Sequence, residues 1–131
     1  MVIVDTSAWI EFFGNGIPEI VQTVDDCLVR DLVGIGDLVY CEVVKGLRIK
    51  SERDKVMTLL QSLPRFDMVG FDVAEKAAGN YRRLRQKGVT VRKTIDVIIG
   101  TFCAENNFEI VHNDRDFTLM AKHLDLKIYR S

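Results

Sequence analysis

The sequence predicts an α/β fold in which helices cover both faces of a central, mostly parallel sheet, giving a three-layer sandwich. Short apolar runs of high β-propensity recur along the chain, and between them lie longer segments whose apolar residues repeat at helical spacing. Strands that alternate with helices in this order are typical of parallel sheets covered by helices. No repeat, low-complexity tract or linker interrupts the pattern, so we expect residues 1–131 to form a single domain.

The first strand is expected at residues 1–4, because this run is apolar and rich in β-branched residues. It stops at Asp5-Thr6-Ser7, residue types that favour helix N-caps, and Asp37 is a second candidate cap after another short strand. The elements expected in this half are a strand at 1–4, helices at 7–13 and 17–30, a strand at 32–35, helices at 37–47 and 56–63, and a strand at 66–69.

The second half begins with a long helix that Asp72 is expected to cap and Gly88 to end. One side of this helix is apolar and the other carries Arg and Lys. Thr94 is the expected cap of the next helix, and the strand after that helix has high β-propensity. The expected elements are helices at 72–87 and 95–105, a strand at 109–111, a short helix at 117–123 and a strand at 127–129.

The composition indicates an ordinary globular protein. A chain of 131 residues can bury about two-thirds of the surface that its unfolded form exposes, which is enough for one core. The sequence shows no apolar run of about 20 residues and no signal-peptide pattern, so we expect no membrane span and a cytoplasmic location. Lys and Arg total 18 against 19 Asp and Glu, so binding to a nucleic acid would require a local basic face.

The cysteines Cys27, Cys41 and Cys103 are widely spaced among apolar neighbours. An odd number of cysteines at such spacing indicates neither a disulfide framework nor a zinc site. We therefore expect all three to be reduced thiols in the core.

Acidic residues follow two of the expected strands at the point where each strand ends. Asp5 comes directly after the first strand, and Asn113, Asp114 and Asp116 follow the strand at 109–111. Ligands of open parallel sheets gather at the carboxyl ends of the strands, so these acids are expected to face one crevice.

Glu42 and Asp96 each lie inside an otherwise apolar helical segment. A buried carboxylate needs a partner, and carboxylates about 4 Å apart repel by about 4 kcal/mol per pair at an effective dielectric near 20. A divalent cation would reverse that repulsion, and hard oxygen ligands favour Mg²⁺ or Mn²⁺ over zinc. Each acid also has an ordinary explanation: a helix cap, a helix-surface or ion-paired residue, or, for Asp96, a favourable interaction with the helix dipole.

Taken together, these residues resemble a known family, the PIN domain. The resemblance spans essentially the whole chain, and in size and order it is similar to the VapC toxins of prokaryotic toxin-antitoxin pairs. It rests on four motifs: Asp5-Thr6-Ser7 after an N-terminal strand, Glu42 followed by Val43-Val44-Lys45-Gly46-Leu47, Thr94-Ile95-Asp96 at a helix start, and the closing His112-Asn113-Asp114-Arg115-Asp116-Phe117.

The resemblance implies an endoribonuclease that needs Mg²⁺ or Mn²⁺, is commonly a homodimer and is inhibited by a cognate VapB antitoxin. Asp5, Glu42 and Asp96 take three of the family's acidic positions. Both Asp114 and Asp116 fit the fourth position, so we retain both. Asp5 and Asp96 are the expected direct metal ligands, and tRNA and rRNA are candidate substrates.

Five further residues are candidates for substrate binding. Thr6 and Ser7 could contact a phosphate oxygen or a ligand carboxylate, or could simply cap the first helix. Asn113 matches an Asn of the family motif. Arg82 and Arg85 belong to the densest basic stretch, part of which is expected to contact the RNA backbone unless it is only a solvated face; its other members are Arg83, Lys87, Arg92 and Lys93.

Other functions remain open at this point. A noncatalytic PIN-like module would act only through its antitoxin, and a Mg²⁺-dependent phosphatase or a DNA nuclease would use the same acids. A phosphoacceptor receiver domain would need a Lys after a later strand, and no such Lys stands near the acids.

Overall fold

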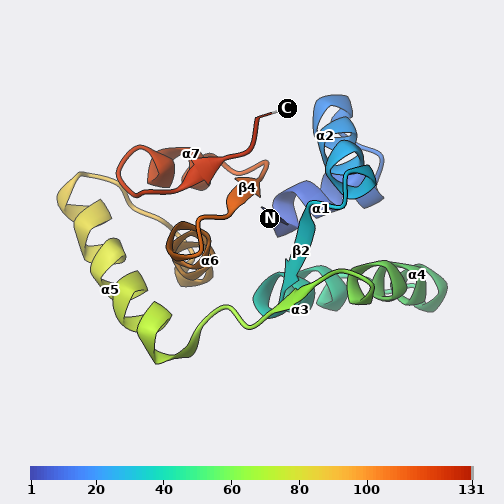
Figure 1. The fold of residues 1–131 in the computed structure, drawn as a ribbon, viewed down its shortest axis with the longest axis horizontal. Coiled ribbons are helices and arrows are strands. Elements are labelled where there is room, and N and C mark those ends of the chain that lie inside the picture. Colours follow the sequence, from blue (N-terminus) through green and yellow to red (C-terminus); the bar gives the residue numbers. More distant parts are fainter. Residues whose placement is uncertain (131) are drawn as a thin grey trace.

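The computed structural model describes residues 1–130 and contains a five-stranded sheet of order β3-β2-β1-β4-β5 in which every pairing is parallel. Helices α2 and α4 lie on one side of β2 and helices α5 and α6 on the other (Figure 1). The strands are β1 (Val2–Val4), β2 (Val33–Gly36), β3 (Arg65–Phe66), β4 (Glu109–Val111) and β5 (Lys127–Ile128). The helices are α1 (Thr6–Phe13), α2 (Pro18–Val29), α3 (Asp37–Lys45), α4 (Lys50–Gln61), α5 (Gly70–Gln86), α6 (Thr94–Glu105) and α7 (Arg115–Ala121). The expected α/β sandwich is confirmed.

Strand β1 occupies the centre of the sheet because its three residues can be buried on both faces. Val2, Ile3 and Val4 are 2%, 0% and 0% exposed, and such continuous apolar runs are typical of parallel strands covered on both sides. In the register of the sheet, Ile3 lies opposite Gly34 of β2 and Ile110 of β4. The three strands therefore end near one another.

The ends of β1 and β4 are also joined beyond the paired residues. The Asp5 N–H donates to the carbonyl oxygen of Val111 at 2.8 Å, which fixes the first residue after β1 against the last residue of β4. Helix α1 follows β1, α3 follows β2 and α7 follows β4, so the first turns of these helices meet at the carboxyl edge of the sheet.

The helix caps differ from the expectations at three positions. Asp37 and Thr94 are the first residues of α3 and α6, whose N-caps are the preceding Gly36 and Lys93, and Asp72 lies inside the first turn of α5. The side chain of Asp37 instead accepts hydrogen bonds from the backbone N–H groups of Leu38 and Met68. Aspartate is favoured throughout the first turn by the helix dipole, so Asp37 and Asp72 do not mark the cap itself.

Two element boundaries were also wrong. Helix α4 begins at Lys50 and not at 56, because its first six residues are polar and show no apolar spacing, although a Lys50–Asp54 pair at 2.9 Å is at helical spacing. Strand β3 ends at Phe66 and not at 69, because the chain turns away toward Gly70, whose φ of +70° favours glycine.

The cysteine prediction was right for two residues of three. Cys27 and Cys103 are buried, and all three cysteines are free, but Cys41 is exposed. Apart from Glu42, the residues around Cys41 are apolar, so the sequence pattern does not show which face of α3 points to solvent. Within residues 1–130, no helix is long and apolar enough to cross a membrane.

Candidate active site

A pocket of about 130 Å³ lies at the carboxyl edge of the sheet, and half of its lining residues are acids. Four carboxylates reach it from four different segments: the end of β1, helix α3, the first turn of α6 and the N-cap of α7. The lining residues are Asp5, Thr6, Ser7, Ile10, Glu42, Lys93, Asp96 and Asp114. Residues up to 109 positions apart in the chain therefore meet in one small space.

Asp5 is held rigidly at the start of α1. Its Oδ2 atom accepts hydrogen bonds from the Ser7 N–H at 3.0 Å and from the Ser7 hydroxyl at 2.7 Å. The Ser7 Oγ atom in turn accepts the backbone N–H of Asn113 at 2.9 Å. Ser7 thereby links Asp5 to the loop that follows β4, and burial raises the pKa of the Asp5 carboxyl above its ordinary value.

Glu42 is oriented by the helix that faces it. It lies on α3 and its Oε1 atom accepts a hydrogen bond from the Thr6 hydroxyl at 2.9 Å. Thr6 is the first residue of α1, so the hydroxyl fixes the Glu42 side chain next to Asp5 without neutralising it. The second oxygen of the Glu42 carboxylate remains available to a ligand.

Asp96 is the most perturbed acid of the site. It is 4% exposed in the first turn of α6, and its pKa is raised to about 7, chiefly by burial and next by the negative charge of Asp5. Asp114 and Glu42 raise this pKa further, whereas the positive charge of Lys93 lowers it. Like charges and desolvation act in the same direction here, as expected of carboxylates gathered for a cation.

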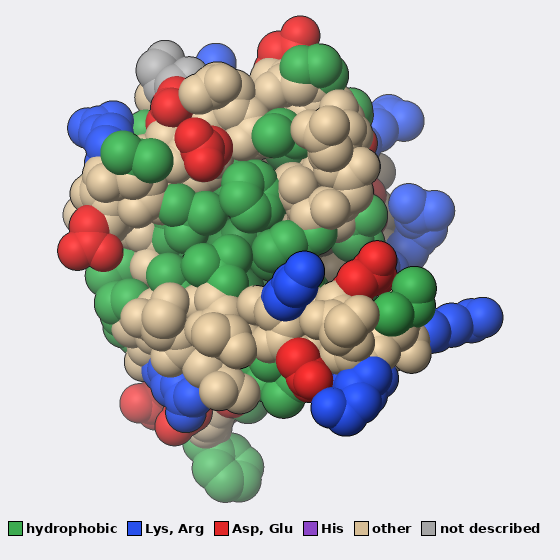
Figure 2. Space-filling model, turned by 90° about the vertical axis from the view of Figure 1, so that its right-hand side faces the viewer, with side chains coloured by type: hydrophobic (Ala, Val, Ile, Leu, Met, Phe, Trp, Pro, Cys, Tyr) green, Lys and Arg blue, Asp and Glu red, His purple; other side chains and the backbone are tan. Residues whose placement is uncertain are grey.

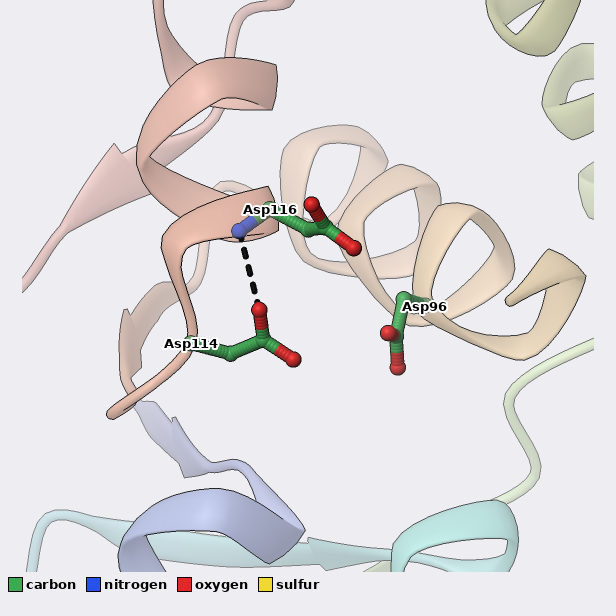
Figure 3. A group of neighbouring side chains, drawn as sticks. All are labelled: Asp96, Asp114 and Asp116. Atoms are coloured by element: carbon green, nitrogen blue, oxygen red, sulfur yellow. Dashed lines mark hydrogen bonds between the residues drawn. The ribbon is translucent and has the colours of Figure 1, made fainter. Parts of the chain in front are cut away.

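Asp114 and Asp116 lie close to Asp96 (Figure 3). Asp114 is the N-cap of α7, and its Oδ1 atom accepts the backbone N–H of Asp116 at 2.9 Å. One carboxylate oxygen of each of the three residues lies within 4.8 Å of the others. The structure therefore brings both candidates for the fourth acidic position to the same cluster.

A divalent cation fits this set of groups. Among residues 1–130, Oδ1 of Asp5 and Oδ2 of Asp96 are buried side-chain oxygens that have no hydrogen-bond partner. An unpartnered buried oxygen is costly, and a bound cation would satisfy both atoms. Every side-chain atom of the pocket that could ligate a cation is an oxygen, apart from the nitrogen of the positively charged Lys93. Oxygen ligands match the preference of Mg²⁺ and Mn²⁺.

The candidate substrate-binding residues are not all in one place. Thr6 and Ser7 line the pocket, and Asn113 adjoins it through the Ser7 hydroxyl. Arg82 and Arg85 are exposed on α5 and are not among the lining residues, and the Arg85 guanidinium lies 6.0 Å from the Tyr81 ring centroid. Their contact with RNA stays a prediction.

The sequence placed Lys93 in the densest basic stretch but did not distinguish it from the other basic residues there, and the structure shows that it lines the pocket. Its neighbour Arg92 lies beside the acids as well, with Nε 4.0 Å from Oδ2 of Asp116. The signal that separates these two from the rest of the basic stretch is their position immediately before the helix start that carries Asp96.

Comparisons with known proteins agree with the fold. A family model described as PIN domain matches residues 2–123. VapC ribonuclease Mb1587 from Mycobacterium bovis and Ribonuclease VapC11 from Mycobacterium tuberculosis are each 27% identical to this chain, covering 97% of it and 96% of the relative. The crystal structure of Rickettsia felis VapBC2 bound to a promoter DNA fragment superimposes with a TM-score of 0.77 at 16% identity, covering 98% of both chains. DNA-bound VapBC from Salmonella typhimurium gives a TM-score of 0.76 at 17% identity, covering 98% and 96% of the two chains. This chain belongs to the PIN-domain family.

Proposed function

We propose that this protein is an endoribonuclease that hydrolyses RNA phosphodiester bonds with Mg²⁺ or Mn²⁺ and acts as the toxin of a VapBC-type pair. The observation that carries the proposal is the meeting of five carboxylates at one edge of the sheet, two of them with unpartnered buried oxygens. The relatives named as VapC ribonucleases, aligned over nearly the whole chain, support the assignment of RNA as the substrate.

Asp5 and Asp96 are the residues that would hold the cation directly, because each presents a buried oxygen without a partner in the described chain. Asp114 and Asp116 lie next to Asp96 and would complete the coordination, directly or through water. When bound, the cation supplies Lewis acidity that polarises the scissile phosphate and makes a nearby water more acidic.

The residues of the chain then have distinct tasks. Glu42, fixed by the Thr6 hydroxyl, is placed to orient the attacking water and to accept a hydrogen bond from it. Ser7 holds Asp5 and the loop after β4 at a constant separation. Asp5 and Asp96 are buried at the base of the pocket, so the electrostatic interactions of these two carboxylates are stronger than those of surface acids.

A VapB-type antitoxin is the proposed partner, since the structural neighbours are VapBC complexes. Figure 2 views the side of the molecule that carries α2 and α4, and apolar side chains gather across the middle of this face. Phe12 and Phe13 of α1 are only partly buried, whereas Trp9 is wholly buried and belongs to the core. An amphipathic antitoxin helix would suit such a face. We also propose that the protein forms a homodimer and acts in the cytoplasm.

The test is cleavage of purified tRNA and rRNA by the wild type and by Asp5→Asn and Asp96→Asn. Activity is expected with Mg²⁺ or Mn²⁺, is expected to stop with EDTA, and is expected to be absent in both variants while their circular dichroism is unchanged. Asp125→Asn is the matched control, because Asp125 is exposed and lies outside the pocket. Cleavage that persists in EDTA or in the variants would reject the metal assignment. A wild type that cuts no RNA but binds its antitoxin would favour the noncatalytic module.

A further inference from the structure

Lys93 places a positive charge at the rim of an acidic pocket. Among residues 1–130 it is the one basic side chain that lines the pocket, together with Asp5, Glu42, Asp96 and Asp114. The backbone fixes this placement, since Lys93 is the N-cap of α6 and Val91, two residues earlier, is only 3% exposed. The buried valine and the helix start hold the lysine at the rim.

Within residues 1–130, the Lys93 ammonium forms no ion pair with the acids around it. In the described part of the chain, no carboxylate oxygen lies within 4.0 Å of its nitrogen, and the ion pairs that do form involve other residues. Arg92 is also largely free, because its side chain is 83% exposed and approaches Asp116 only at 4.0 Å. A cation that is held in an acidic site without being paired is available to an incoming anion.

A phosphate needs such a cation here. The carboxylates that would hold a metal ion also repel every RNA phosphate that approaches the pocket, and the net charge of the chain, -1, supplies no general attraction. Sequence-independent contacts to RNA phosphates are made mostly by Lys and Arg. Lys93 is closer to the acids than the basic residues of α5, which are not among the lining residues.

We propose that Lys93 binds the RNA phosphate that enters the acidic pocket and so positions the scissile bond over the metal ligands. The inference rests on the proposed function, since it assumes that RNA is the substrate of this pocket. Arg92, on the Asp116 side of the cluster, is placed to contact a neighbouring phosphate. Lys93 therefore attracts the substrate while it repels the metal ion.

Because Lys93 is proposed to strengthen RNA binding and to weaken metal binding, the two affinities are measured separately. RNA affinity is measured by fluorescence anisotropy of a labelled RNA hairpin with Mn²⁺ present, on the Asp5→Asn background so that binding is observed without cleavage. Lys93→Ala is expected to weaken binding about tenfold and to lower the slope of log affinity against log salt by about one. Lys93→Arg is expected to restore both quantities, because it restores the charge.

Mn²⁺ affinity is measured separately by calorimetry without RNA on the otherwise wild-type chain. Lys93→Ala is expected to bind Mn²⁺ at least as tightly as the wild type, because a repelling charge has been removed. Lys122→Ala is the control. Lys122 is exposed at the C-terminal end of α7, whereas Asp114 of the pocket caps the N-terminal end, so loss of the Lys122 charge is expected to change neither the RNA affinity nor the Mn²⁺ affinity.

Equal RNA affinity and salt slope with and without the Lys93 ammonium would overturn the assignment, and so would RNA that fails to bind the Asp5→Asn protein. Loss of RNA and Mn²⁺ binding together in Lys93→Ala would also overturn it, since that result indicates a structural role. Failure of the wild type to cleave RNA with Mn²⁺ is a different result, which rejects the proposed nuclease and not the binding of phosphate by Lys93.

Discussion

Replacement of Asp96 by Asn is expected to stabilise the metal-free protein at alkaline pH. In the folded wild type the pKa of Asp96 is about 7, against an ordinary value of 3.8, so folding takes up a proton between these values. Stability is consequently lost as the pH rises from about 4 to about 7, because the unfolded chain ionises freely and the folded chain does not. The amide of Asn mimics the neutral acid and removes this loss.

The magnitude follows from the size of the shift. The full difference between 3.8 and about 7 corresponds to about 4 kcal/mol. Water in the open pocket screens part of it, and we expect about 2 kcal/mol at pH 8. At pH 5 only the lower part of the interval has been crossed, so the gain should be about 1 kcal/mol. In a chain of 131 residues, about 2 kcal/mol raises the melting temperature by about 6 to 10 °C.

Urea denaturation of wild type and Asp96→Asn in EDTA at pH 5 and pH 8 measures this gain, with Asp125→Asn as a surface control expected to change stability by less than about 0.5 kcal/mol. Addition of Mn²⁺ should then stabilise the wild type and leave Asp96→Asn unaffected, because a ligand stabilises only the state that binds it. Equal stabilities of the wild type and Asp96→Asn at pH 8, or a gain that does not grow from pH 5 to pH 8, would refute this reasoning.

Two further substitutions test the residues that support the site. Ser7→Ala removes the hydroxyl that donates to Asp5 and is expected to lower Mn²⁺ affinity by about 10- to 100-fold in calorimetry. Ser7→Thr should retain most of the affinity, and equal affinities for Ser7→Ala and wild type would contradict this role of the hydroxyl. Gly36→Ala would place a methyl group against the buried Met68 side chain at the end of β2 and is expected to cost about 1–3 kcal/mol in urea denaturation. An unchanged unfolding free energy would show that Met68 can move aside.

The sequence was sufficient for the elements that carry a strong local pattern. The apolar run of β1, the helical spacing of α2 and the high β-propensity of β4 each predicted their element within about two residues, a normal uncertainty for element ends. Helix α4 was predicted only in part, because its first half is polar and contributes no apolar period. Local rules describe neighbours three or four positions apart, and they are strongest where burial imposes the period.

The sequence also determined which acids to consider, since Asp5 and Asp114 follow strands and Asp96 interrupts an apolar helix. Only the tertiary structure decided how these residues combine. It placed Asp114 and Asp116 together beside Asp96, and it brought Lys93 into the same pocket. These contacts depend on the parallel register of β1 with β2 and β4 and on the direction in which each helix leaves the sheet. Such long-range geometry is set by the packing of the whole core, and therefore no local pattern of residues encodes it.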